Sequence, residues 1–274
     1  MRRRRSDWRR SQLSSEFERA KTFLNIAGRR YVVESDLHTH TTFSDGRGSI
    51  EDNVRGAIDA GLKQVALTEH GPGHVGFGIA RKNILKAKNE VMRVRREYPD
   101  IEILFGIEAN IIAPYGRLDI RQDEFGCFDF VCAGWHFAGV DGLMPVGLAK
   151  TAYNVVRNAG KKQAAGYMRE NTDTIVRAIN GGGIKFLTHP GDKVPVYMRE
   201  IAAACEKTGT LLEINTAHMS LTPGVIKSIM RMDVNFIICS DAHNARRVGD
   251  FRAAEALINE SGLDPARVVN LRRL

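Results

Sequence analysis

The chain has 274 residues, of which 43% are hydrophobic and 26% are charged. This composition is typical of a globular protein and excludes a largely disordered or fibrous chain, and the length suits one large domain or two small ones. No apolar run approaches the roughly 20 residues that a membrane-spanning helix needs, so we expect no membrane partner. The four cysteines form no C-x-x-C pair, and a reducing, cytoplasmic location explains them most simply.

The positive charge lies almost entirely in the first 30 residues. The formal net charge is +8, and residues 1–30 alone contribute +7, with ten Arg or Lys and three Asp or Glu. The remaining chain is therefore nearly neutral. A domain that binds duplex nucleic acid usually carries its own basic stripe, so nucleic acid is a less favoured partner than a small molecule.

We interpret residues 1–30 as a basic N-terminal extension and residues 31–274 as the folded domain. Repulsion between like charges predicts disorder over residues 1–13. Residues 14–28 have an apolar face typical of a short helix, which Gly28 would end. The extension could be a solubilising tail, a partner-binding arm or an oligomer contact, and the sequence leaves these alternatives and the oligomeric state open.

From residue 31 onwards, short apolar segments alternate with longer segments of helical pattern. Strands are predicted near residues 31–37, 64–68, 101–107, 128–133, 184–188, 210–214 and 235–239. Helices are predicted near residues 49–61, 81–97, 163–180, 194–208, 222–232 and 249–258. The alternation predicts a parallel α/β sheet, either doubly wound or closed into a barrel. Residues 134–162 form the longest irregular connection, which is typical of a lid or binding loop.

Histidines and carboxylates follow the predicted strands. In chain order, the segments are DLHTH with FSDG, then TEHG, GIEAN, GWH, THPG, EINT and SDAH, and six of the eight histidines lie within a few residues of a strand end. The carboxyl ends of parallel strands form one face of an α/β fold, and that face carries the chemistry. We therefore expect these residues to converge in space.

Imidazole and carboxylate together are typical ligands of Zn, Mn or Fe. His38 and His40 are two residues apart, so in extended backbone both point to the same side, and Asp241 with His243 repeats this spacing. A single histidine after a strand is usually only a loop residue. The joint pattern of nine candidate ligands instead indicates two or three divalent ions.

Other polar residues near the strand ends have less certain roles. We interpret His74 as a loop residue, whereas His218 follows the sixth strand and could face a substrate. Glu69 is expected to hold an imidazole in place rather than to act as a catalytic acid, and Glu213 is expected to support a ligand in a similar way.

The ordered series DLHTHTTFSDG, LTEHG, GIEAN, GWH, THPG, EINT and SDAH resembles the PHP (polymerase and histidinol phosphatase) superfamily over about residues 34–250. The resemblance implies a (β/α)7 TIM-like barrel of seven parallel strands with a trinuclear metal site at its C-terminal face. It implies three ligand sets, which are His38, His40, Glu108 and Asp241 for one ion, Glu108, His136 and His189 for a second, and Asp45, His70 and His243 for a third.

The resemblance also implies a metal-dependent phosphoesterase in which a hydroxide bridging the ions attacks phosphorus. Glu108, Asp241 and His243 are the expected catalytic residues. Cations that could clamp the phosphate, together with His218, are Arg47, Arg81, Lys82, Lys150, Arg246 and Arg247. We favour a small phosphomonoester, such as histidinol phosphate or a nucleotide, as substrate. The alternatives are a nuclease or nucleotide phosphodiesterase with the same site and a non-catalytic metal-binding accessory module.

Overall fold

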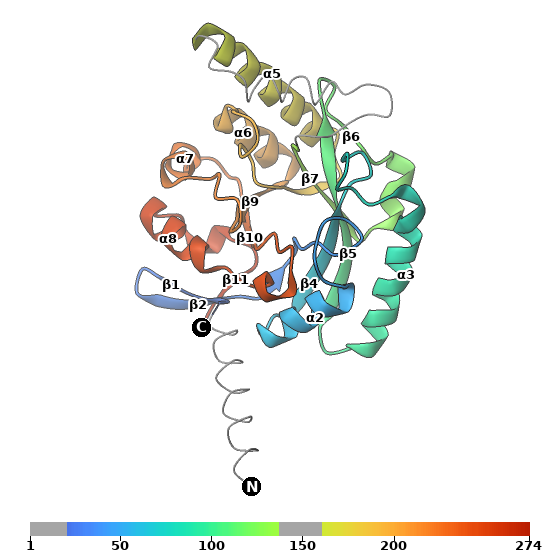
Figure 1. Ribbon diagram of the computed structural model, residues 1–274. Helices are drawn as coiled ribbons and strands as arrows, with labels where there is room; N and C mark the ends of the chain where they lie inside the picture. The colour runs from blue at the N-terminus through green and yellow to red at the C-terminus, as the bar shows by residue number, and fades with distance from the viewer. Residues whose placement is uncertain (1–20, 137–160) are drawn as a thin grey trace.

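The computed structural model describes residues 21–136 and 161–274. In these ranges a central sheet contains seven parallel strands arranged around a nearly closed barrel (Figure 1). From one edge to the other these are β10 (Phe236–Cys239), β9 (Leu211–Asn215), β8 (Ile184–Leu187), β7 (Phe130–Gly134), β5 (Glu102–Ile112), β4 (Gln64–His70) and β3 (Ser35–Asp36). The prediction of a seven-stranded α/β barrel is confirmed.

Helices follow the strands and cover the outside of the barrel, with α2 and α3 on one side and α5 to α8 on the other (Figure 1). The α-helices are α2 (Ile50–Asp59), α3 (Arg81–Glu97), α5 (Lys161–Asn180), α6 (Met198–Thr208), α7 (Pro223–Ile229) and α8 (Arg252–Ser261). Three short 3-10 helices are η1 (Gln122–Cys127), η2 (Ala245–Arg247) and η3 (Pro265–Arg267). None of the described helices has the length and apolar character needed to cross a membrane.

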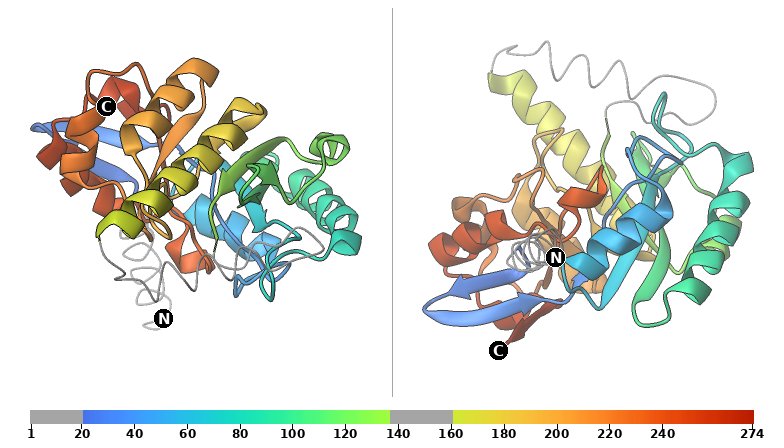
Figure 2. Two further views of the ribbon diagram at one scale, coloured as in Figure 1. Left: turned by 90° about the horizontal axis from the view of Figure 1, so that it is seen from above. Right: turned by 60° about the horizontal axis from the view of Figure 1, so that its bottom comes forward.

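A second, three-stranded antiparallel sheet joins the two ends of the described chain. It is formed by β1 (Phe23–Ile26), β2 (Arg29–Val33) and β11 (Leu271–Arg273), and Figure 2 shows its hairpin beside the C-terminus. The helix predicted over residues 14–28 is wrong in its described part, because Leu24 and Ile26 are buried while their neighbours are exposed, a strand alternation. Residues 1–20 lie outside the described residues.

The barrel closes where its first and last parallel strands meet, and we call this junction between β3 and β10 the seam. Thr39 and Ala242 form an isolated parallel bridge just beyond the two strands. Asp36 is fully buried and accepts hydrogen bonds from Ser240 N at 3.1 Å and Gly249 N at 2.9 Å. The seam is therefore held largely by side chains and by a single bridge, rather than by a long ladder.

A small cluster of buried apolar side chains packs between the strands of the barrel. Its members are Leu37, Ala66, Cys132, Phe186, Ile237 and Cys239. The Phe186 ring lies 6.3 Å from the His38 ring, so this cluster meets the first of the predicted metal ligands. Cys132, Cys205 and Cys239 are buried free thiols, as the sequence predicted. The two-residue strand β6 (Arg117–Leu118), which was not predicted, pairs with the far end of β5.

Candidate metal centre

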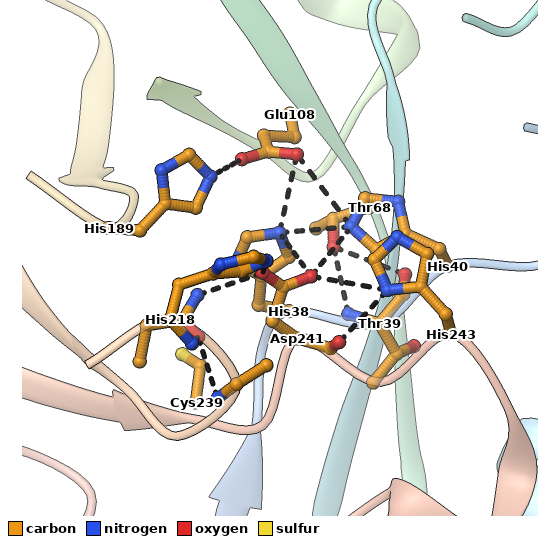
Figure 3. A network of polar contacts seen from close by, with 12 residues as sticks. His38, Thr39, His40, Thr68, Glu108, His189, His218, Cys239, Asp241 and His243 are labelled. Carbon is orange, nitrogen blue, oxygen red and sulfur yellow. Dashed lines mark hydrogen bonds and ion pairs between the residues drawn. The ribbon is translucent and has the colours of Figure 1, made fainter. Parts of the chain in front are cut away.

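All nine predicted ligands lie at the C-terminal ends of the barrel strands and point toward one another, and Figure 3 labels six of them, His38, His40, Glu108, His189, Asp241 and His243. The ligand atoms of eight of them fall into three groups, and within each group all atoms lie within 4.8 Å of one another. The ninth, His189, lies beside these groups, with its Nε2 3.0 Å from Glu108 Oε1. Asp45 and His243 are half-buried, and the other seven are buried. The predicted ligands converge in space, as expected from their positions after the strands. The role of each residue as a metal ligand stays a prediction.

The first group contains His38, His40 and Asp241. His38 Nε2 and His40 Nε2 are 3.0 Å apart, and His40 Nε2 lies 3.3 Å from Asp241 Oδ1. The segment that carries the two histidines is fixed by α2, because the buried Asn53 side chain donates to His40 O at 2.9 Å. Two ring nitrogens that face each other across 3.0 Å are positioned to share one cation.

The second group is built around Glu108 in β5, together with His70 and His136. Glu108 Oε2 lies 2.8 Å from His70 Nδ1, and Oε1 lies 3.2 Å from His136 Nε2 and 3.0 Å from His189 Nε2. The predicted second set is thus assembled, with His70 added to it. Because Oε2 is also 3.3 Å from His38 Nε2, Glu108 connects the first and second groups.

The third group contains Asp45, His70 and His243, as predicted, and also His40. Asp45 Oδ2 lies 3.3 Å from His243 Nε2, and Asp45 Oδ1 lies 3.6 Å from His70 Nε2. The His40 ring stacks between those of His70 and His243 at centroid distances of 4.3 and 4.4 Å. His40 and His70 therefore each belong to two groups, so the groups adjoin rather than stand apart.

The hydrogen bonding of these residues fits a site for cations. Buried ligand atoms that have no hydrogen-bond partner include His40 Nδ1, Asp45 Oδ1, Glu108 Oε2, His136 Nε2 and Asp241 Oδ1. Leaving a buried polar atom unpaired costs about 1–3 kcal/mol, and here several unpaired atoms converge on the same small region. Divalent ions would satisfy them, because imidazole nitrogen and carboxylate oxygen together suit Zn, Mn or Fe.

The pKa values of the individual ligand side chains differ sharply. Burial lowers the pKa of His40 and of His136 to about 3, so both rings are neutral near pH 7. Burial alone would raise the pKa of Glu108, but the surrounding histidines hold it well below its usual value. Burial would also lower the pKa of His70, yet Glu108 and Asp45 raise it to about 10. Neutral imidazoles and ionised carboxylates are the forms that bind metals, so an ion at His70 would displace a proton.

The backbone at two of these residues is strained. His189 has φ +29° and Asp241 has φ +51°, a region that side chains other than glycine rarely adopt. Such outliers persist only where surrounding contacts enforce them and are concentrated at functional sites. At His189 one such contact is visible, because its backbone N donates to Glu213 Oε2 at 2.6 Å.

Two buried glutamates support the site, one of them differently from the prediction. Glu213 Oε1 lies 2.6 Å from His38 Nδ1, which agrees with its expected supporting role. Glu69 was expected to hold an imidazole, and this is wrong. It accepts hydrogen bonds from Thr41 N, Thr41 Oγ1 and Ser44 Oγ, so it fixes the turn that presents Asp45.

A cavity of about 260 Å³ opens above the three groups. Six of the predicted ligands line it together with His74, Phe77, Lys193 and His218. His218 therefore faces the site. His74 lies in the loop between β4 and α3, as predicted, and it also lines the cavity. Lys193 was missed by the sequence analysis. It lies four residues beyond His189, just past the THPG segment, and following each strand-end segment a few residues further would have found it.

The arginines and lysines predicted to clamp phosphate do not line this cavity among the described residues. Arg81 is held away from it, since its guanidinium pairs with Glu124 and donates to Asp119 O at 2.6 Å. Arg47, Lys82 and Arg246 are exposed, Arg247 is half-buried and lies 3.6 Å from Asp250, and Lys150 lies outside the described residues.

Comparisons with known proteins agree with this architecture. A probable phosphatase of Shewanella sediminis is 27% identical over 251 residues, which cover 88% of this chain and 90% of the relative. A putative histidinol phosphatase structure from Listeria monocytogenes has TM-score 0.59 at 17% identity, covering 79% of this chain and 97% of that one.

A structure of histidinol phosphate phosphatase from Lactococcus lactis contains zinc, L-histidinol and phosphate. It has TM-score 0.56 at 19% identity and covers 85% of this chain and 95% of that chain. At these identities the two solved structures establish the shared fold. The family model of the PHP domain matches residues 36–217, about two thirds of the chain. Together with the seven-stranded barrel and the ordered strand-end motifs, this match shows that the chain belongs to the PHP domain family.

Proposed function

We propose that the protein is a metal-dependent phosphoesterase that hydrolyses a small phosphomonoester with the help of two or three divalent ions. The observation that carries the proposal is the convergence of six histidines and three carboxylates at the carboxyl ends of the barrel strands, with several of their buried polar atoms left without a hydrogen-bond partner. The phosphatase names of the matched relatives support the reaction class. The zinc in the Lactococcus lactis structure makes zinc the first metal to test.

Three ligand sets would hold the ions, and Glu108 would contribute to two of them. When bound, divalent ions activate water for attack at phosphorus and neutralise charge on the phosphoryl oxygens. The chain's own contribution is placement. Glu213 orients the His38 ring from behind, Glu69 fixes the turn that carries Asp45, and Asn215 donates to Asp241 Oδ2 at 3.0 Å.

The shape of the site favours a small ester over a polynucleotide. The cavity measures about 260 Å³, smaller than the roughly 300–1,000 Å³ of ordinary small-molecule pockets. Grooves that bind single-stranded nucleic acid carry a basic track along the backbone. Among the described residues that line this cavity, Lys193 alone is a lysine or arginine. These features support a phosphomonoester such as histidinol phosphate.

A substrate panel tests the proposal directly. Protein loaded in turn with Zn, Mn or Fe would be assayed on histidinol phosphate, mononucleotides, a diester and an oligonucleotide. We expect turnover of at least one monoester, and we expect His136→Ala to reduce it by at least about 100-fold by removing a ligand. Turnover of diesters alone would replace the monoester assignment, and no turnover with any metal would contradict the proposed activity.

A further inference from the structure

We propose that Lys193 is a phosphate-binding residue of this site and that Asp192 is the positioning residue that holds it there. The inference rests on the proposed function, because it assigns a role toward the phosphoryl group of the substrate. Lys193 is not one of the expected metal ligands, and it lies outside the motifs that suggested them. Its position on the cavity wall is the starting observation.

The loop after β8 brings Lys193 back over the site. The chain reverses at His189 and again at Gly191, which has φ +86°, and Asp192 N then donates to His189 O at 3.1 Å. Lys193 consequently lines the same cavity as His189 and Asp241. Only 22% of its side chain is exposed, although lysine side chains usually extend into solvent.

Asp192 fixes this arrangement through two contacts. Its Oδ2 pairs with Lys193 Nζ and lies 3.4 Å from His218 Nδ1. His218 is itself fixed, because its backbone N donates to Asn215 Oδ1 at 2.7 Å. The carboxylate therefore spans from the loop after β8 to the loop after β9, and it holds a cation and an imidazole on the same wall.

The charge of the cavity lining explains why this lysine matters. Six of the lining residues are expected metal ligands, all carboxylates or imidazoles, and Lys193 is the one lysine or arginine among the described lining residues. A phosphoryl group has three non-bridging oxygens, so an oxygen that does not contact an ion needs a partner from the chain. A lysine ammonium is a strong point-charge partner for such an oxygen.

Binding of inorganic phosphate, the expected product, provides the first test. Calorimetric titration of metal-loaded protein would compare the wild type with Lys193→Gln, Lys193→Arg and the matched control Lys207→Gln, which changes an exposed lysine at the end of α6. We expect Lys193→Gln to weaken phosphate binding about tenfold, as for loss of one charge-assisted hydrogen bond. Lys193→Arg should restore most of the affinity, and Lys207→Gln should change nothing. Equal affinity in all four proteins, at equal metal content, overturns the proposal.

Steady-state kinetics distinguishes weaker substrate binding from a general loss of active enzyme. Lys193→Gln should raise KM more than it lowers kcat, and Asp192→Asn should shift KM in the same direction by a smaller factor. A uniform loss of kcat with KM unchanged would contradict a binding role.

A measurement on the wild-type protein does not depend on whether a variant folds poorly or loses metal. In wild-type protein, phosphate should slow the modification of Lys193 by an amine-reactive reagent, followed by mass spectrometry, and leave Lys207 unaffected. Absence of protection overturns the proposal. Protection without hydrolysis of any phosphomonoester would leave the Lys193 site standing and remove the proposed function, whereas hydrolysis without protection would do the reverse.

Discussion

At the scale of single residues, Glu108 is the most connected side chain of the site. Its two oxygens lie within 3.6 Å of the ring nitrogens of His38, His40, His70, His136 and His189. A carboxylate at such a position contributes to more than one ion, so its loss should affect the whole site rather than one part of it.

The substitution Glu108→Gln tests this expectation. It keeps the shape of the side chain but removes the charge, and we expect bound metal to fall by at least one ion per chain and activity to fall by at least about 100-fold. Metal content would be measured by mass spectrometry after dialysis. Glu102→Gln is the control, because Glu102 lies in the same strand but is exposed, and its side chain bonds only to Gln64 among the contacts described. Full metal content in Glu108→Gln would contradict its role.

Asp119 is a buried carboxylate outside the metal groups. It accepts hydrogen bonds from Gly73 N and Asn110 N, and burial nevertheless raises its pKa to about 6. The folded protein thus keeps a proton on Asp119 at pH values where the unfolded chain has lost it. The resulting stability is complete below the unfolded pKa and is lost as the pH rises through about 6.

The pH dependence of Asp119→Asn makes this measurable. Relative to the variant, the wild type should lose about 2 kcal/mol of unfolding free energy between pH 4.5 and 7.5. Urea unfolding of both proteins at several pH values gives the difference. A difference that stays constant, or that grows in favour of the wild type with rising pH, would show that Asp119 is not protonated in this range.

At the scale of the elements, the close approach of β7 and β8 depends on a glycine. A Cβ built at Gly134 would lie 2.1 Å from Thr188 Oγ1 and 3.3 Å from Glu108 Oε1. Any larger residue must therefore displace the buried Thr188 side chain and press on the neighbouring His189 and Glu108 side chains. The sequence GWH marks this position, but only the structure shows why the glycine is needed there.

Gly134→Ala should destabilise the protein by about 1–3 kcal/mol through overpacking and should weaken metal binding at the same time. Gly166→Ala is a matched control, since Gly166 lies within α5 and has no neighbour within 4 Å of an added Cβ. There alanine should stabilise the helix by up to about 1 kcal/mol. The melting temperatures of the two variants, measured by thermal unfolding, test this prediction. Equal melting temperatures for Gly134→Ala and Gly166→Ala would refute the packing argument.

The elements also show what the sequence could and could not predict. Six strands of the barrel were found because each is an apolar run followed by polar residues. The first predicted strand, residues 31–37, instead covers part of β2 in the antiparallel sheet and the two-residue barrel strand β3. β1 was mistaken for part of a helix because its alternation is only four residues long. The sheet that it forms with β2 is completed by β11, which pairs with β2 and lies at the other end of the chain. The partner of Glu69 and the position of Lys193 depend on how loops turn in space, which local patterns do not encode.

At the scale of the whole molecule, the ligand groups link residues from every part of the barrel. Ions that bind only the folded chain stabilise it by an amount that rises with the logarithm of their free concentration over the dissociation constant. Removing them with a chelator should therefore lower the melting temperature, and adding back Zn or Mn should restore it. An excess of 100-fold over the dissociation constant corresponds to about 2.7 kcal/mol. A melting temperature that does not respond to metal would argue against the centre.

The position of the seam shows which parts of the chain a bound ion would connect. Asp36 and Ser240, which join there, are 204 residues apart in sequence, and the His38–His40 pair and Asp241 continue from the two strands on either side. An ion held by these residues would act as a cross-link between the beginning and the end of the barrel. Because such an ion binds only the folded chain, it would stabilise the closed barrel through its binding free energy, whereas a disulfide persists in the unfolded chain and restricts it. The described cysteines form no disulfide, so bound metal would provide the cross-link between the first and last parallel strands of the barrel.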